Sequence, residues 1–345
     1  MPTCCSACDD GGRGGVPAVS GTSTDGAVVL EVEHETVYRY GAPVDWAHHQ
    51  AFLQPREDRG QQLLDFALDI DPPPVRLTVE RDRFGNTRHG FTAAGAHRAL
   101  RVRAASRVSL APRPYLRPEE SPPWEQLRDR LTYRAGCRYD PATEFAVPSP
   151  YVPRFEPLRD YALRSFAPRR PVAAAAIELM RRLHADFAYV SASTTVDTPL
   201  EAVWASRRGV CQDFAHLLVG ALRMLGLAAR YVSGYLLTQP PPGQAPLVGA
   251  DASHAWVALW CPRDEPGGSD DAVEGGWLEL DPTNACVPAQ DHVRVAIGRD
   301  YGDVTPLRGV IRGGGAHELA VRVTTRRVAG DATPPDAPKW GTQVA

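Results

Sequence analysis

The sequence predicts an α+β protein with two structurally different parts. Residues 28–112 contain short runs in which apolar and polar residues alternate, as they do in antiparallel strands with one buried face. From about residue 156, apolar residues instead recur at helical spacing, and three strand-like runs follow these helices. Helices that precede an antiparallel sheet, rather than alternate with its strands, favour the α+β class.

Four runs in the first part predict strands, namely "VVLEVEHETVYRY", "LLDFALDI", "VRLTVERDRFGNTRHGF" and "HRALRVRAASRVSL". The turn signals "GAPV", "DPPP" and "FGNT" lie between or within them. We therefore expect a mostly antiparallel β domain, arranged as a sandwich.

Composition divides the rest of the chain. Gly-, Ser- and Pro-rich ends are typical of disordered tails, and a Pro-rich stretch without periodicity is typical of a linker. The predicted units are a tail at 1–27, the β domain at 28–112, a linker at 113–155, a second domain at 156–330 and a tail at 331–345.

The second domain begins with helical patterns. "FEPLRDYALRSF" and "PVAAAAIELMRRLHADF" predict two helices, and "CQDFAHLLVGALRMLG" predicts a third that begins near Cys211 and ends at Gly226. The runs "AARYVSGYLLT", "SHAWVALW" and "GWLELDPT" then predict three antiparallel strands.

Composition also limits the classes of function. The chain of 345 residues is 43% hydrophobic and 23% charged, with a net charge of -3, so neither nucleic acid nor an anionic membrane is an expected partner. No apolar run approaches the roughly 18 residues that span a bilayer, and the N-terminus lacks the apolar core of a secretory signal. The oligomeric state is left open.

The seven cysteines are an odd number, and three of them lie in the first tail, which is a poor basis for disulfides. A reducing compartment suits them better, so we expect a cytoplasmic protein. Cys5 and Cys8 have C-x-x-C spacing, but no second pair follows, so an unstructured tail is favoured over zinc binding.

Cys211 lies where the third helix begins. The unpaired backbone N–H groups and the positive dipole at that end stabilise a thiolate, which is the reactive form of cysteine. Cysteine is also a common small buried residue, and Cys211 on its own favours that interpretation.

Two further residues change this balance. His254 begins a strand-like run 43 residues after Cys211, and Asp281 ends the next such run 27 residues later. Separately they are typical of a core histidine and a turn former before proline. Neighbouring strands place side chains about 5 Å apart, so Asp281 could hold an imidazole that serves Cys211 as a base.

The stretches "GVCQDFAHLLVGALRMLGLAARYVSGYL", "SHAWVALW" and "WLELDPTN" resemble the three motifs of the transglutaminase-like superfamily. "LEVEHETVYRYGAPV" and "DRFGNTRHGF" resemble the β-rich N-terminal region of one bacterial branch, so the resemblance covers roughly residues 28–290. It implies a papain-like core in which Cys211 is the nucleophile, His254 the base and Asp281 its orienter, with no cofactor.

The resemblance implies acyl transfer on peptide or isopeptide amide bonds of a peptide or protein substrate. The three residues do not decide between a cysteine protease or amidase and a transglutaminase, because both form the same thioester. Some relatives have lost catalytic residues, so a non-catalytic binding or scaffold protein is the alternative. The loops at 239–252 and 261–275 are expected to set specificity.

The oxyanion needs donors. The Cys211 backbone N–H is one, and Gln212, Trp204 and Tyr189 are candidates for the second. Trp204 also fits the apolar face of a short helix, as a packing residue would. We expect structural roles for Asp213 and His216. The helix dipole favours an acidic residue such as Asp213 in the first turn, and the turn of the helix directs His216 away from Cys211.

Metal sites are not favoured. Cysteine, histidine and aspartate can all bind zinc, but Cys211, His254 and Asp281 lack short ligand spacings and an evident fourth ligand. The acidic segment 263–274 is expected to be a solvated loop rather than a calcium site.

Overall fold

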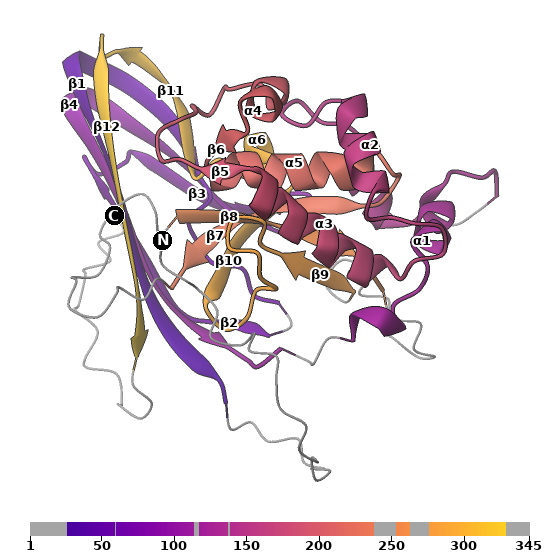
Figure 1. Cartoon of the computed structure of the whole chain (residues 1–345). Coiled ribbons are helices and arrows are strands. Elements are labelled where there is room, and N and C mark those ends of the chain that lie inside the picture. The colour runs from indigo at the N-terminus through magenta and orange to yellow at the C-terminus, as the bar shows by residue number, and fades with distance from the viewer. Residues whose placement is uncertain are drawn as a thin grey trace, which may run out of the picture.

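The computed structural model describes residues 26–58, 60–113, 117–136, 139–237, 253–262 and 276–328. They form an α+β fold, as predicted, with long strands at one side of the molecule and helices at the other (Figure 1). Both predicted tails lie almost entirely outside the described residues, and so do the C-x-x-C pair, the segment 263–274 and most of both predicted specificity loops.

The first sheet is antiparallel and is organised by two strands of 24 residues that run side by side, β1 and β4. One edge of β1 carries β12 and then β11, and the far edge of β4 carries β2 and then β3. Its strands are β1 (Val28–Ala51), β2 (Gln61–Asp71), β3 (Arg76–Arg81), β4 (Thr87–Leu110), β11 (Leu307–Gly313) and β12 (His317–Val328).

This sheet is continuous, which differs from the predicted sandwich of two sheets. The register of β1 against β4 shifts between Arg39 and Val44 and again before Trp46, and such irregularities bend strands. Val44 and Phe91 from one half of the sheet share a buried cluster with Val102 from the other. The long strands therefore enclose a small core by bending rather than by passing into a second sheet.

The second sheet is also antiparallel, with the strand order β10-β7-β8-β9. Its outer strand β10 was not among the predicted strands. The sheet consists of β7 (Ala229–Leu236), β8 (Ser253–Trp260), β9 (Trp277–Leu280) and β10 (His292–Gly298).

Helices α2, α3 and α4 pack against α5, which is buried along nearly its whole length. Apolar residues recur in it at helical spacing, and Gly226 just beyond it has a φ of 77°, a backbone conformation typical of glycine after a helix. The helices are α1 (Trp124–Leu131), α2 (Glu156–Leu163), α3 (Val172–Asp186), α4 (Leu200–Ser206), α5 (Cys211–Arg223) and α6 (Tyr301–Val304), with 3-10 turns at Pro118–Glu120 and Pro141–Phe145 and a parallel pair of short strands, β5 (Ala188–Tyr189) and β6 (Arg208–Gly209).

The stretch predicted as a linker at 113–155 is more ordered than its proline content indicated. It contains α1, whose Trp124, Leu127 and Leu131 are buried in the main core. The Trp124 indole also donates a hydrogen bond of 3.1 Å to the carbonyl of Ala167. These contacts hold the segment against the helices of the second part.

The predicted second domain at 156–330 likewise needs a correction. Its last strands, β11 and β12, return to the first sheet and pair with β1. The long β1 would otherwise expose a row of unpaired backbone groups, which the returning chain pairs instead. The first sheet is thus built from both ends of the chain.

Side chains of the first part cover the free edge of β10. Gln61 accepts from the N–H of Arg294 at 2.8 Å and donates to its carbonyl at 2.7 Å. Asn86 does the same for Ile297, at 2.8 and 2.7 Å. Both amides are buried and stand in for the missing neighbouring strand, so the two parts are held together at this edge.

None of the helices in the described part of the chain is long and apolar enough to cross a membrane.

Candidate active site

Cys211 is the first residue of α5, and the preceding Val210 is extended. The thiol is partly buried and, like those of Cys261 and the more buried Cys286 in the described part of the chain, forms no disulfide. The N–H groups of a first helical turn lack the usual i−4 partners, and that of Asp213 is bonded to the Val210 carbonyl at 2.9 Å. The position favours a thiolate and any negative charge that forms beside it.

Asp213 fixes the backbone that leads into this helix. Its buried carboxylate accepts from the Val210 N–H at 2.8 Å and from the Thr194 hydroxyl at 2.6 Å. Burial raises the pKa of Asp213, although both hydrogen bonds oppose that shift. A Cβ on Gly209 would lie 2.7 Å from the carboxylate, so only glycine fits there. Asp213 has the structural role that the sequence suggested.

His254 lies on β8 opposite Gly234 of β7 and is buried. Its Nε2 donates to Asp281 Oδ2 at 2.7 Å, which leaves Nδ1 as the ring nitrogen for its hydrogen bond with the Cys211 side chain. Burial alone would lower the pKa of His254, but the Asp281 charge outweighs it and, together with Cys211, raises the pKa to about 10. The imidazole is therefore poised as a cation between a thiol and a carboxylate.

Asp281 follows β9 and is completely buried. Its Oδ1 accepts the N–H groups of Thr283 and Asn284, at 2.9 and 3.1 Å, as expected for an aspartate that begins a turn. Its Oδ2 accepts from His254 and from the Asn284 amide at 2.7 Å. Burial would raise the pKa of Asp281, but His254 outweighs it and lowers that pKa, so the carboxylate is ionised.

A second histidine completes the cluster, and sequence reasoning missed it. His292 Nε2 lies 3.1 Å from Asp281 Oδ2, and its Nδ1 lies 2.6 Å from Asp291 Oδ1. Asn284, the last residue of the quoted "DPTN" stretch, was missed as well. The only signal for His292 is its place at the start of the strand-like run "HVRVAIG".

Two of the three candidate oxyanion donors lie near the start of α5. Tyr189 on β5 pairs with Gly209 and is 42% exposed. Gln212 follows Cys211 directly, but its side-chain amide donates to the carbonyl of Val196 at 3.3 Å. Of the three, only Tyr189 thus combines an exposed polar side chain with a position along the loop before Cys211.

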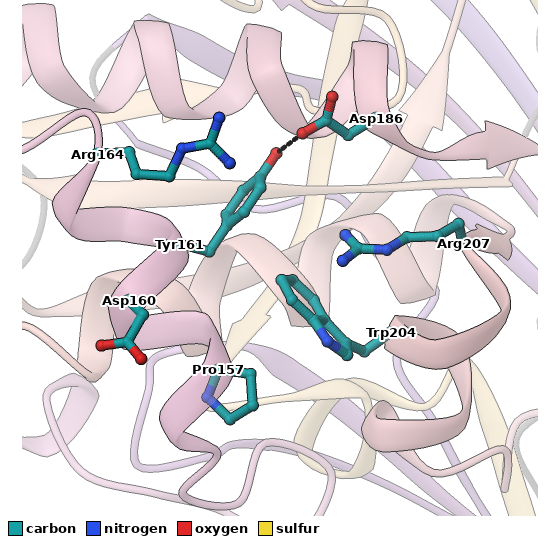
Figure 2. A pocket seen from close by; sticks show the side chains of 7 residues that line it. All are labelled: Pro157, Asp160, Tyr161, Arg164, Asp186, Trp204 and Arg207. Carbon is teal, nitrogen blue, oxygen red and sulfur yellow. Dashed lines mark hydrogen bonds between the residues drawn. The ribbon is translucent and has the colours of Figure 1, made fainter.

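Trp204, the third candidate, lies in an aromatic cluster with packing partners on several sides. Its ring meets Phe155, Tyr161 and Phe187, with centroids 5.4 to 6.0 Å apart, and the Arg207 guanidinium lies 3.8 Å above it. Trp204 and Arg207 line a hollow of about 620 Å³ together with residues of α2 and the end of α3. Figure 2 shows the side chains of Trp204 and Arg207 next to each other. These contacts account for the tryptophan without an oxyanion role.

His216 lies behind the thiol on the same helix and does not join the cluster around Asp281. Its Nε2 accepts the N–H of Tyr301 at 3.2 Å, and its ring packs on Tyr151 and Tyr231. Burial, with a smaller contribution from Arg223, lowers the pKa of His216 to about 3. It is a neutral packing residue that binds a neighbouring segment, in agreement with the expected structural role.

Among the described residues, one group of three could bring metal ligands together: His254, Asp281 and His292. Both imidazole Nε2 atoms already bond to Asp281 Oδ2, at 2.7 and 3.1 Å. A metal ion would have to replace these hydrogen bonds, and no fourth ligand belongs to the group. The donor set fits a hydrogen-bonded cluster better than a metal centre.

The fold and the site define a class of protein in which a helix-start cysteine faces a histidine and an aspartate from adjacent strands. Residues 30–109 match the bacterial transglutaminase-like N-terminal region, and residues 160–282 match the transglutaminase-like superfamily. The chain therefore belongs to the transglutaminase-like superfamily and carries its bacterial N-terminal region.

Individual relatives agree with this assignment. An uncharacterized protein of Mycobacterium tuberculosis is 41% identical over 283 residues, which cover 81% of this chain and 86% of that protein. A protein-glutamine gamma-glutamyltransferase of Pseudomonas aeruginosa is 32% identical over 178 residues, 48% of this chain and 25% of that enzyme. The crystal structure of a candidate cysteine protease from Cytophaga hutchinsonii shares the fold, with a TM-score of 0.66 and 20% identity over 90% of this chain and 94% of that one.

Proposed function

We propose that this protein is a thiol-dependent acyl-transfer enzyme that acts on amide bonds of peptides or proteins through a thioester on Cys211. The observation that carries the proposal is the continuous contact from the Cys211 thiol through His254 to the buried Asp281. A buried carboxylate that holds an imidazole against a helix-start thiol is the arrangement that activates a cysteine nucleophile.

In the proposed reaction the Cys211 thiolate attacks the carbonyl carbon of the amide. The carbonyl oxygen becomes an oxyanion next to the N–H groups at the start of α5. His254 then gives its Nδ1 proton to the departing nitrogen, the C–N bond breaks, and an amine leaves behind the thioester. Asp281 keeps the imidazole oriented and stabilises its charged form throughout.

The thioester can then react with either of two nucleophiles. Neutral His254 accepts a proton from the incoming molecule, which attacks the thioester carbonyl and releases the thiolate. Water completes hydrolysis, as in a protease or amidase, whereas a primary amine completes transamidation. The relative from Pseudomonas aeruginosa, a protein-glutamine gamma-glutamyltransferase, supports including glutamine side chains among the amides tested.

Alkylation by iodoacetamide tests the thiol without needing a substrate. We expect Cys211 to react faster at neutral pH than Cys261 and Cys286, which are internal controls in the same chain. A His254→Gln variant should remove this advantage. Equal labelling of all three cysteines in the wild-type protein would favour a non-catalytic scaffold.

A glutamine-containing protein with a biotinylated primary amine tests the chemistry. Incorporation of biotin demonstrates transfer, ammonia release without incorporation demonstrates amidase activity, and new N-termini demonstrate proteolysis. The Cys211→Ala variant is the control for each product. Tyr189→Phe, a change of one hydroxyl, tests the second oxyanion donor, and we expect it to lower kcat more than it changes KM.

A cytoplasmic location remains a prediction from cysteine usage.

A further inference from the structure

We infer that His292 is a positioning residue of this site. Together with His254 it holds the Asp281 carboxylate in place, and it brings a second positive charge next to that carboxylate. The inference rests on the proposed function, because it assigns His292 a role in setting how readily His254 gives up its proton. It follows from the position of the ring, from its two partners and from the oxygen atom that it shares with His254.

The position of His292 is fixed on both sides of the ring. The residue begins β10 and is 1% exposed. One ring nitrogen lies 3.1 Å from Asp281 Oδ2 and the other 2.6 Å from Asp291 Oδ1. Its ring also meets Trp256 edge to face, with centroids 5.2 Å apart. The imidazole can therefore neither rotate away nor exchange its partners without disturbing the strand.

Its two partners determine the charge of His292. An ionised carboxylate only accepts hydrogen bonds, and a neutral imidazole has only one N–H to donate. Two carboxylate partners are therefore fully satisfied only by an imidazolium. Burial would lower the pKa of His292, but the hydrogen bonds to Asp281 and Asp291 outweigh it and raise the pKa. The same contact lowers the pKa of Asp291 against its own burial.

The shared oxygen atom connects this charge to the chemistry. Oδ2 of Asp281 accepts from both His254 and His292, whose ring centroids are 5.9 Å apart. A carboxylate that already faces one imidazolium attracts a second one less strongly, and the two cations repel each other. Without His292, Asp281 would hold the proton of His254 more tightly, and that proton must pass to the leaving amine.

Among the described residues, the other charged group close to the two rings, Glu279, is already paired. Glu279 lies on the same side of the sheet as Asp281 and accepts from the Trp256 indole at 3.0 Å. It also pairs with Arg294 at 3.2 Å and with Arg113 at 2.8 Å. Cys211 interacts with His254 and also faces the buried Tyr231. A change at His292 should therefore be felt mainly by Asp281 and His254.

Two variants separate charge from geometry. His292→Gln removes the cation but keeps an amide N–H that can reach Asp281. Asp291→Asn leaves the imidazole in place but withdraws the carboxylate that favours its charged form, and the Asp291 side chain is 28% exposed, so this variant should fold. His216→Gln is the matched control, because His216 is also a buried histidine of the second part but does not contact Asp281.

The measurement is the rate of Cys211 alkylation by iodoacetamide as a function of pH, with folding checked by thermal unfolding. Removal of a nearby positive charge raises the pKa of the groups that it faced. We expect the alkaline inflection, which reports loss of the His254 proton, to move up by about one pH unit in His292→Gln. Asp291→Asn should move it in the same direction by less, and His216→Gln should not move it.

An alkaline inflection that stays in place in folded His292→Gln would overturn the inference, since it would leave His292 a merely structural role. If His292→Gln does not fold, an unmoved alkaline inflection in Asp291→Asn would overturn the inference instead. Alkylation needs no substrate, so the two proposals can fail separately. A shifted inflection without turnover of any amide would contradict the proposed function alone, and turnover without a shift would contradict this inference alone.

Discussion

Two sets of buried histidines in this molecule differ in charge: one is neutral and the other is cationic. In the first sheet, burial lowers the pKa of His34 and of His49 to about 4, so both are neutral. In the second sheet, His254 and His292 are buried to a similar extent, yet their pKa values are raised. The difference is the carboxylate of Asp281, which the histidines of the first sheet lack.

His216 shows that the carboxylate, and not the sheet, makes this difference. It belongs to the second part of the molecule, yet burial lowers its pKa to about 3. Its hydrogen-bond partner is the backbone N–H of Tyr301, which suits a neutral ring that accepts. These buried histidines are therefore neutral where they lack a carboxylate partner, and they are cationic where Asp281 supplies one.

The largest effect should follow removal of the Cys211 thiol, which the charged pair of His254 and Asp281 activates. In Cys211→Ser the hydroxyl stays protonated at neutral pH, so His254 has no thiolate to pair with. We expect the rate of amide turnover to fall at least about 1,000-fold. Cys261→Ser should keep wild-type turnover and is the control. Full activity of Cys211→Ser would place the chemistry elsewhere.

A smaller effect is expected when Asp281 is changed, because His254 is then buried without a carboxylate partner, like the histidines of the first sheet. In Asp281→Asn the amide oxygen can still accept from Nε2, but burial is no longer opposed by a negative charge. The pKa of His254 should fall, and the alkaline inflection of Cys211 alkylation should move to lower pH. Turnover should drop, but less completely than in Cys211→Ser, because the amide oxygen can still orient the imidazole. An inflection that moves upward would contradict our account of the charge.

Some parts of the site and fold could be read from the sequence because their signals are local. The helix that begins at Cys211 follows from apolar spacing, and the partners His254 and Asp281 follow from residue type, order and family resemblance. The buried face of α1 was missed, because the proline content of residues 113–155 indicated a linker, although Trp124, Leu127 and Leu131 lie at helical spacing there.

Other parts depend on contacts between distant segments. His292 reaches Asp281 only because β10 pairs with the far edge of β7, and a strand-like run does not reveal its neighbour. The return of β11 and β12 to β1 was hidden for the same reason. The roles of Tyr189 and Gln212 stay predictions, because an oxyanion donor is defined by the position of a substrate atom.

The smallest expected effect concerns His49, which lacks the carboxylate that His254 has. The His49 ring is stacked on Phe91 at 5.1 Å, and its buried Nδ1 has no hydrogen-bond partner. Burial lowers its pKa in the folded state to about 4, with smaller contributions from His48 and His97. An unfolded histidine titrates near pH 6.5, so between about pH 6.5 and pH 4 the unfolded chain binds a proton that the folded chain refuses.

The folded protein should therefore lose stability as the pH falls through this window, and His49→Phe should remove the share due to His49. Phenylalanine keeps a flat ring against Phe91 and cannot titrate. The quantity to compare is the free energy of unfolding of the variant minus that of the wild type. We expect this difference to be about 2 kcal/mol larger at pH 5 than at pH 8. Urea unfolding of both proteins at the two pH values measures this. His254 has the opposite sign, because its pKa is raised to about 10, so its stabilising contribution is complete below pH 6.5 and is lost as the pH rises toward 10. If His49→Phe left the acid dependence unchanged, then burial would not make this histidine neutral, and the contrast between the two sheets would rest on something other than Asp281.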